Sequence, residues 1–241
     1  MKRVSAMLLS IIILCAFSMQ VFAADGDRDR SHAGYLYENV DGDLSIEEGA
    51  CPFIPQKSIP AVSYNNKQAE LLSTNGFKKT LKMPHFKQEN GYYCGPATVQ
   101  QTISYVGKVT VSQRVLAKEL GTTKDGTDMR NIAGVVNKHI SGTGKSYTMM
   151  QIPNSQSDYA VNIYNALCAG KPVIIDIKAT KEDRWNYKTK GHFLNISGVR
   201  CNDLQNTVTV TDPNSDDRTN KYDLSVVYKV NNKHFRRSYI W

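Results

Sequence analysis

Cys94 is the residue in this sequence whose type and position most directly predict chemistry. It lies where a glycine-bearing loop is expected to become a helix that residues 97–103 can continue, and Pro96 has a ring-fixed φ suited to the first helical turn. The first N–H groups of a helix lack internal acceptors, and the aligned peptide dipoles add a positive field there. Such a position favours the thiolate, which is the form of cysteine that attacks carbonyl carbons. Cys94 is therefore the candidate nucleophile.

A predicted hairpin supplies a base and an acid for such a nucleophile. Residues 192–199 and 207–212 have the β-branched content of strands, and turn-forming residues lie between them. If the chain folds back near Asn202 to Leu204, His192 comes near Asp212. The period of two in a strand also places each of these residues at the end of an apolar half-face. The hairpin thus predicts a histidine and a carboxylate together at one edge of a sheet.

These residues fill separate roles in one mechanism. A thiol nucleophile needs an imidazole that holds it as thiolate and later protonates the leaving amine, and His192 is the candidate for this base. The imidazole needs a carboxylate on its other nitrogen, which Asp212 would supply, with Asn214 and Asp216 as alternatives. The tetrahedral oxyanion needs donors, and the amide of Gln88, six residues before Cys94, has suitable reach.

The cysteines allow a competing interpretation. Outside the N-terminal apolar segment the chain has four of them, and an exported chain favours disulfides. If all four pair, Cys94 is structural; if Cys94 is the nucleophile, at most one disulfide forms. The spacing of the cysteines matches no zinc motif, so neither a metal site nor a cofactor is predicted. The four are Cys51, Cys94, Cys168 and Cys201.

The first 23 residues are predicted to be a secretory signal peptide. Two basic residues precede an apolar run and a small-residue cleavage pattern, with cleavage expected after Ala23 or, as the neighbouring choice, after Ala24. The apolar run is too short for a membrane span, so no stable membrane insertion is expected after cleavage. The predicted location is extracellular or in the cell envelope. Residues 24–80 are polar and rich in Gly and Pro and are interpreted as an extension or pro-segment; residues 81–241 are the predicted catalytic domain.

The charge pattern bears on partners. The formal net charge of the 241-residue chain is +8, but the basic residues are scattered rather than grouped, and few aromatic residues alternate with them. This pattern is more typical of the solvated surface of an exported protein than of a nucleic-acid interface. We expect a peptide or protein substrate, weak attraction to anionic envelope polymers and no nucleic-acid partner.

Further elements follow from local patterns. A capping-box pattern at 110–113 predicts a helix that ends before Gly121, and a second helix is predicted after Asp128, with His139 at its end in a structural role. Residues 147–152 could form a strand, and 158–169 a helix.

The stretch 171–177 reads as a strand buried on both faces, so its Asp176 is expected to be a structural acid that needs a partner. In the predicted loop 180–190, Trp185 and Tyr187 could either line a cleft or pack beneath the loop.

The set of Gln88, Cys94-Gly95-Pro96, Gly191-His192-Phe193 and Asp212-Pro213 resembles the bacteriocin-processing, double-glycine leader peptidases and their stand-alone relatives, which are papain-like cysteine peptidases. The resemblance covers roughly residues 81–228. It implies an α+β papain-like fold, in which a helical half carries the thiol and an antiparallel sheet carries His and Asp. It also implies Cys94 as nucleophile, His192 as base, Asp212 as orienting acid and Gln88 as oxyanion donor.

The predicted function is therefore that of a secreted thiol peptidase, a hydrolase that cleaves peptide or amide bonds through an acyl-thioester on Cys94. Two alternatives stay open from the sequence. The same thiol chemistry serves acyl transferases and transpeptidases, and a non-catalytic secreted binding protein could hold Cys94 in a disulfide.

Overall fold

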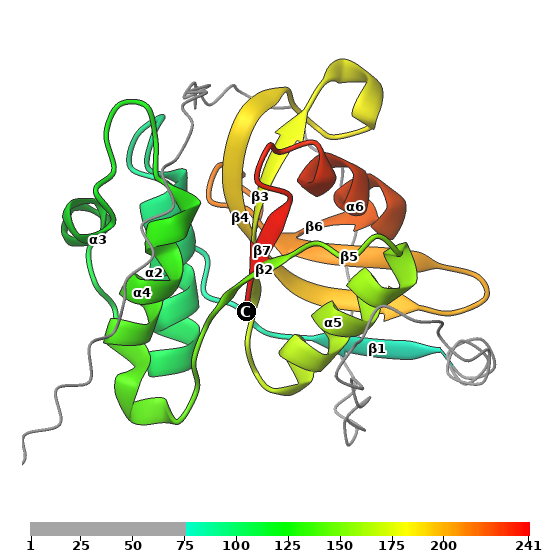
Figure 1. The fold of residues 1–241 in the computed structure, drawn as a ribbon, viewed down its shortest axis with the longest axis horizontal. Coiled ribbons are helices and arrows are strands. Elements are labelled where there is room, and N and C mark those ends of the chain that lie inside the picture. Colours follow the sequence, from blue (N-terminus) through cyan, green and yellow to red (C-terminus); the bar gives the residue numbers. More distant parts are fainter. Residues whose placement is uncertain (1–75) are drawn as a thin grey trace, which may run out of the picture.

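The structure is a computed structural model that describes residues 76–241. These residues form a helical half and a sheet half (Figure 1). The helical half contains α2 (Cys94–Gly107), α3 (Gln113–Leu120) and α4 (Met129–Ile140), with a short 3₁₀ turn, η1 (Ser141–Thr143). The sheet half carries two further helices, α5 (Gln156–Cys168) and α6 (Leu224–Asn232), and a second 3₁₀ turn, η2 (Lys181–Asp183). The predicted signal peptide and most of the predicted extension lie outside the described residues.

One antiparallel sheet of seven strands forms the centre of the sheet half, with the order β2-β7-β3-β4-β5-β6 and β1 paired with the far end of β4. The long strand β4 is paired along its first part with β3 and along its second part with β1 and β5. The strands are β1 (Phe77–Thr80), β2 (Met149–Gln151), β3 (Val173–Ala179), β4 (Thr189–Cys201), β5 (Asn206–Thr211), β6 (Asn220–Asp223) and β7 (Ser238–Ile240).

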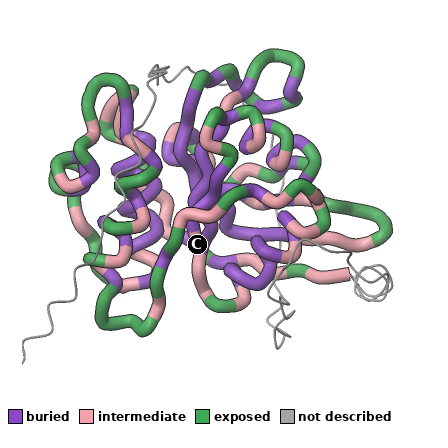
Figure 2. The backbone as a smooth tube through the Cα atoms, viewed as in Figure 1, coloured by how far each residue is buried: buried purple, intermediate pink, exposed green. Residues whose placement is uncertain are grey.

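Side chains on the two faces of this sheet enter two hydrophobic clusters. Along β3, Val173, Ile175 and Ile177 belong to the cluster shared with α5 and α6, whereas Ile174 belongs to the cluster shared with α2, α3 and α4. Figure 2 shows the buried segments concentrated in the central strands and on the facing sides of the helices. The prediction that β3 is buried on both faces is confirmed, and burial on this scale is the main source of stability in such a fold.

The helices form close to the predicted positions, with one difference at α3. Its N-cap is Ser112, whose side chain accepts a hydrogen bond from the Val115 N–H at 3.4 Å, so the capping box predicted from Thr110 is wrong. Gln113 is consequently the first helical residue, and its side chain is not used for capping. Gly121 ends α3 with a φ of +65°, as glycine at this position allows, and Asp128 caps α4.

The predicted hairpin forms, with shifted ends. β4 begins at Thr189, three residues before the predicted start, because the segment after η2 pairs back onto β3 at Ala179. β5 ends at Thr211, one residue early, which leaves Asp212 just beyond the strand. The turn is where it was expected, since the Asn202 side chain accepts hydrogen bonds from the N–H groups of Leu204 and Gln205.

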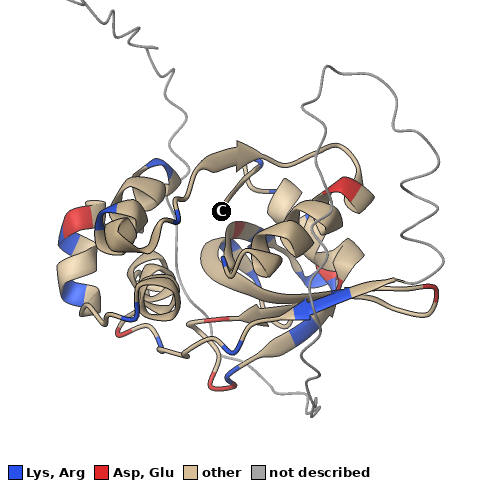
Figure 3. Cartoon of the chain, turned by 90° about the horizontal axis from the view of Figure 1, so that it is seen from below, with Lys and Arg blue, Asp and Glu red and all other residues tan. Residues whose placement is uncertain are grey.

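The sheet also includes four residues that precede the predicted domain boundary at Leu81. Phe77–Thr80 forms β1 and pairs with Gly198–Cys201 of β4. In the described part of the chain, no helix is both long enough and apolar enough to cross a membrane. Lys and Arg are distributed over both halves, with Asp and Glu among them (Figure 3).

Candidate active site

Cys94 is the first residue of α2 and is buried, with 2% of its surface exposed. The N-cap residue, Tyr93, makes no side-chain hydrogen bond to the helix start, so no side chain competes for the field of the first turn. Cys94 is a free thiol, as is Cys201, whereas Cys168 is disulfide-bonded. The interpretation in which all four cysteines pair is therefore wrong.

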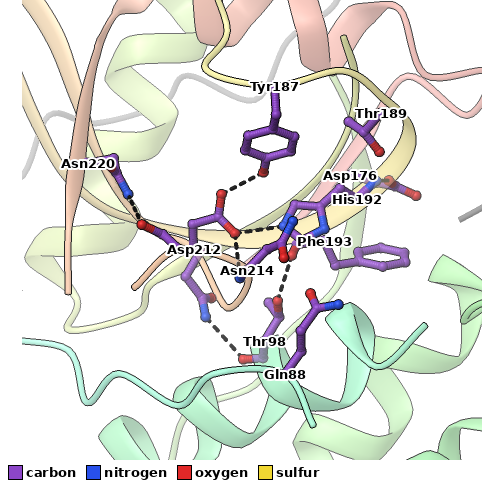
Figure 4. Close-up of polar contacts among 12 residues, drawn as sticks. Gln88, Thr98, Asp176, Tyr187, Thr189, His192, Phe193, Asp212, Asn214 and Asn220 are labelled. Atoms are coloured by element: carbon purple, nitrogen blue, oxygen red, sulfur yellow. Dashed lines mark hydrogen bonds and ion pairs between the residues drawn. The ribbon is translucent and has the colours of Figure 1, made fainter. Parts of the chain in front are cut away.

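His192 and Asp212 meet as the hairpin predicted. The Nε2 atom of His192 lies 2.7 Å from Oδ1 of Asp212, and both side chains are buried (Figure 4). The thiol of Cys94 lies within hydrogen-bonding reach of the same imidazole. With Nε2 engaged by the carboxylate, the ring can bridge the acid and the thiol.

The charge state of this pair follows from its surroundings. Burial disfavours the imidazolium, but the charge and hydrogen bond of Asp212, together with Cys94, outweigh burial and raise the pKa of His192 from 6.5 to about 10. Burial likewise opposes ionisation of Asp212, yet the charge and hydrogen bond of His192 and the hydrogen bonds from Tyr187 and Asn214 hold the pKa of the carboxyl below 3.8. The site therefore favours an imidazolium beside a carboxylate at neutral pH.

Aromatic side chains cover this ion pair. The hydroxyl of Tyr187 donates to Oδ2 of Asp212 at 2.5 Å, and its ring meets the His192 ring edge-on at a centroid distance of 5.6 Å (Figure 4). Trp185 stacks on Tyr222 at 3.9 Å and meets Tyr187 edge-on. Trp185 and Tyr187 are both buried, so the packing interpretation of this loop is confirmed, and Tyr187 additionally fixes the second oxygen of Asp212.

The backbone of His192 is anchored separately by the buried Asp176. Oδ1 of Asp176 accepts a hydrogen bond from the His192 N–H at 3.0 Å, and Oδ2 lies 3.1 Å from Nε2 of His234. Asp176 therefore has the partner that its burial in β3 required. It holds the strand position from which the His192 ring projects.

Gln88 lies in the segment that runs from β1 to α2 beside the end of β5. Its backbone N–H donates to the Pro213 carbonyl at 2.7 Å, and His85 Nε2 lies 3.0 Å from the Asp212 carbonyl. The side-chain Nε2 donates to the Asn90 carbonyl at 2.8 Å. Figure 4 shows the amide end of Gln88 directed toward the strand that carries His192 and Phe193. All four predicted site residues are thus brought to one region.

A buried polar contact fixes α2 against β4 and so fixes Cys94 relative to His192. The Asn195 amide donates to the Thr98 carbonyl and to Oε1 of Gln101, both at 3.0 Å, and accepts from the Thr102 hydroxyl at 2.9 Å. The Thr98 hydroxyl donates to the Phe193 carbonyl at 2.9 Å. Sequence reasoning missed Asn195, although an asparagine among the apolar residues of a strand was a signal that a buried polar contact was needed.

The alternative orienting groups do not take that role. Asn214 donates its backbone N–H to Oδ1 of Asp212 at 2.9 Å, and its side-chain Nδ2 has no hydrogen-bond partner among the described residues, whereas Asp212 takes the His192 Nε2. Asp216 is exposed and forms an ion pair with Lys87. Within residues 76–241, no group of three or more His, Cys, Asp or Glu side chains is arranged to hold a metal ion.

Gly95 lets the loop that precedes α4 approach the start of α2. A methyl group at this position would overlap the side chain of Thr127, so we expect Gly95→Ala to displace the first turn that carries Cys94. The expected cost is about 1–3 kcal/mol of stability, typical of overpacking, together with reduced turnover. Chemical denaturation and rate measurements test this.

The matched control is Gly134→Ala, at an exposed α4 position with open space, which should stabilise the protein by about 0.5–1 kcal/mol. Equal stability of the two variants would contradict the packing argument.

The fold and the site together define a cysteine-type peptidase: a free thiol begins a helix, and an imidazole–carboxylate pair faces it from an antiparallel sheet. Residues 80–240 match the model of the Peptidase_C39-like family, and the chain belongs to that family. No curated protein matches the sequence.

The chain is also similar to several solved structures. A C39-like peptidase from Bacillus anthracis is 15% identical over 68% of this chain and 96% of its own, with a TM-score of 0.50. A double glycine motif protease from an AMS/PCAT transporter, solved with its leader peptide, is 17% identical over 70% of this chain and 94% of its own, with a TM-score of 0.44. A stem bromelain precursor is 12% identical over 79% and 77% of the two chains, at 0.47. The predicted α+β, papain-like fold class is confirmed.

Proposed function

We propose that this chain is an exported peptidase that hydrolyses peptide or amide bonds of a peptide substrate through an acyl-thioester on Cys94. The observation that carries the proposal is the position of the His192 ring, which contacts the Asp212 carboxylate and the Cys94 thiol together. Export is proposed from the features of residues 1–23. The four side-chain roles below belong to the same proposal.

The thiolate of Cys94 attacks the scissile carbonyl carbon, and the electron pair of the C=O bond moves onto oxygen. The side-chain amide of Gln88 and the backbone N–H of Cys94 are the proposed donors to this oxyanion. As the tetrahedral species collapses, the C–N bond breaks and the imidazolium of His192 gives its proton to the leaving amine. Cys94 is then acylated, and the free amine departs.

Hydrolysis of the thioester restores the enzyme. Neutral His192 takes a proton from water, the resulting hydroxide attacks the acyl carbon, and the C–S bond breaks with Cys94 leaving as thiolate. Asp212 keeps the imidazole oriented and stabilises its positive charge throughout, with its second oxygen held by Tyr187. An amine that replaces water at this stage would give transpeptidation from the same intermediate.

Product analysis tests the proposal. Fluorescein-labelled casein should be cleaved by the wild-type protein and should remain intact after the thiol is blocked with iodoacetamide. With a peptide ester and added glycinamide, the predominant product should be the free acid. Cleavage that survives complete thiol blocking would contradict thiol catalysis, and an exclusively amidated product would identify an acyl transferase. A mass measurement of the mature protein tests export, which predicts a new N-terminus after Ala23 or Ala24.

A further inference from the structure

Gln113 is a buried glutamine at the start of α3 that does not serve its own helix. Only 2% of its surface is exposed, and its side-chain amide reaches the segment between β1 and α2. Nε2 of Gln113 donates to the Lys87 carbonyl at 2.7 Å, and Oε1 accepts from the Glu89 N–H at 2.9 Å. These two backbone groups lie on either side of Gln88. One amide side chain therefore forms hydrogen bonds with the backbone on both sides of the proposed oxyanion donor, Gln88.

The orientation of the Gln113 amide is itself fixed. Nε2 also donates to Oε1 of Gln100 at 3.1 Å, and Nε2 of Gln100 in turn donates to the Val111 carbonyl at 2.8 Å. Gln101 adds a bond from its Nε2 to the Phe86 carbonyl at 3.1 Å. Gln113 and Gln101 thus hold the segment that carries Gln88, Gln100 orients the Gln113 amide, and of these three only Gln113 contacts both neighbours of Gln88.

Gln88 has few other restraints. Its backbone N–H is held by the Pro213 carbonyl, and its side chain is held by one bond from Nε2 to the Asn90 carbonyl. Oε1 of Gln88 is buried and has no hydrogen-bond partner among the described residues. The position of the side-chain amide consequently depends on where the backbone at 87–89 is held. An oxyanion donor works only within about 2.7–3.1 Å of the developing charge, so small displacements reduce its effect strongly.

We propose that Gln113 is a positioning residue for catalysis, which acts by holding the backbone on both sides of Gln88 so that the Gln88 amide meets the oxyanion. The inference rests on the oxyanion role given to Gln88 under the proposed function. In this proposal α3 contributes no reacting group, but its first residue helps to stabilise the transition state by positioning Gln88.

The test is Gln113→Met, which keeps the length of the side chain and removes its bonds to the Lys87 and Glu89 backbone together with its bond to Gln100. We expect kcat on a quenched-fluorescence peptide to fall by about tenfold to a hundredfold with KM little changed, because a transition-state donor is displaced. The rate at which iodoacetamide alkylates Cys94 should stay the same. If Gln113→Met does not fold, Gln113→Asn serves instead, since the shorter amide cannot reach both Lys87 and Glu89.

The matched control is Asn137→Leu. The Asn137 side chain also forms two hydrogen bonds with backbone groups, both of Tyr147. It donates to the Tyr147 carbonyl at 2.9 Å and accepts from the Tyr147 N–H at 2.6 Å. This contact lies in the helical half and involves none of the site residues. Asn137→Leu should lower the melting temperature about as much as Gln113→Met and leave kcat unchanged.

A double variant separates positioning from general destabilisation. If Gln113 acts through Gln88, then Gln113→Met should change kcat less than about twofold in a Gln88→Ala background, because coupled residues are not additive. An undiminished effect in that background, or wild-type kcat in Gln113→Met, would overturn the inference. Both failures leave thiol catalysis standing, whereas activity in Cys94→Ala would overturn the proposed function itself.

Discussion

Replacing Cys94 with alanine should abolish turnover while leaving the fold intact. The side chain supplies the atom that forms the covalent intermediate, so kcat is expected to fall by at least about 10⁴-fold, as it does when a nucleophile is removed from a catalytic set that acts as a unit. The measurement is cleavage of labelled casein by purified protein, with circular dichroism to show that the fold is retained. Cys94 contributes a small buried side chain, so the cost to stability should be about 1 kcal/mol.

Cys201 provides the matched control for this experiment. It is the other free cysteine of the described residues, and burial raises the pKa of its thiol to about 12, so it should be unreactive at neutral pH. Cys201→Ala should retain activity and the wild-type extent of iodoacetamide labelling, whereas Cys94→Ala should lose both. Turnover in Cys94→Ala, or labelling that maps to Cys201 in the wild-type protein, would contradict the assignment of the nucleophile.

Asp212→Asn should move the pH dependence of activity downward. In the wild-type protein, Asp212 keeps His192 protonated well above pH 6.5 despite its burial, with a pKa of about 10. Removing the carboxylate leaves burial to act against the imidazolium, so the alkaline limb of kcat/KM should shift toward or below pH 6.5. At pH 8 the variant should therefore lose most of its activity, by about 10²–10⁴-fold.

The same pair makes a signed contribution to stability. Folding raises the pKa of His192, so the stabilisation from its imidazolium is fully present below pH 6.5 and is lost as pH rises through about 10. Folding lowers the pKa of Asp212, so the stabilisation from its carboxylate is present above pH 3.8 and is lost as pH falls. Unfolding free energy followed from pH 6.5 to 10 should decline in the wild-type protein and change less in Asp212→Asn. Asp216→Asn, at an exposed neighbour, is the control and should keep the wild-type profile. An unshifted alkaline limb in Asp212→Asn would exclude Asp212 as the group that sets the charge of His192.

Local patterns in the sequence predicted much of the site because its parts lie at the ends of regular elements. A proline-bearing helix start placed Cys94, and two strands with turn-forming residues between them brought His192 to Asp212. Each of these inferences depends on a periodicity or a turn, which are local properties of the chain. The papain-like fold class was predicted from the resemblance that the same motifs carry. The family match over residues 80–240 confirms the resemblance, and the fold of the chain confirms the fold class.

What the sequence did not predict are the contacts between segments far apart in the chain. Gln113 fitted a local capping pattern, but its amide is used 24 and 26 residues away, at Glu89 and Lys87. Tyr187 was undecided between a cleft and a packed core, and only the folded chain brings its hydroxyl to Asp212. Asn195 likewise acquires a role only when α2 is packed on β4. Such contacts depend on how the helices and strands pack against each other, and local patterns in a single sequence do not specify that packing.

The most direct test of thiol catalysis is the intact mass of the protein during turnover. A slowly hydrolysed peptide ester, quenched with acid within the first turnover, should add the mass of its acyl group to the wild-type protein. Digestion should place that group on the peptide that contains Cys94, and hydroxylamine, which cleaves thioesters, should remove it. Full turnover without any acyl adduct, or an adduct that maps to a residue other than Cys94, would contradict the account.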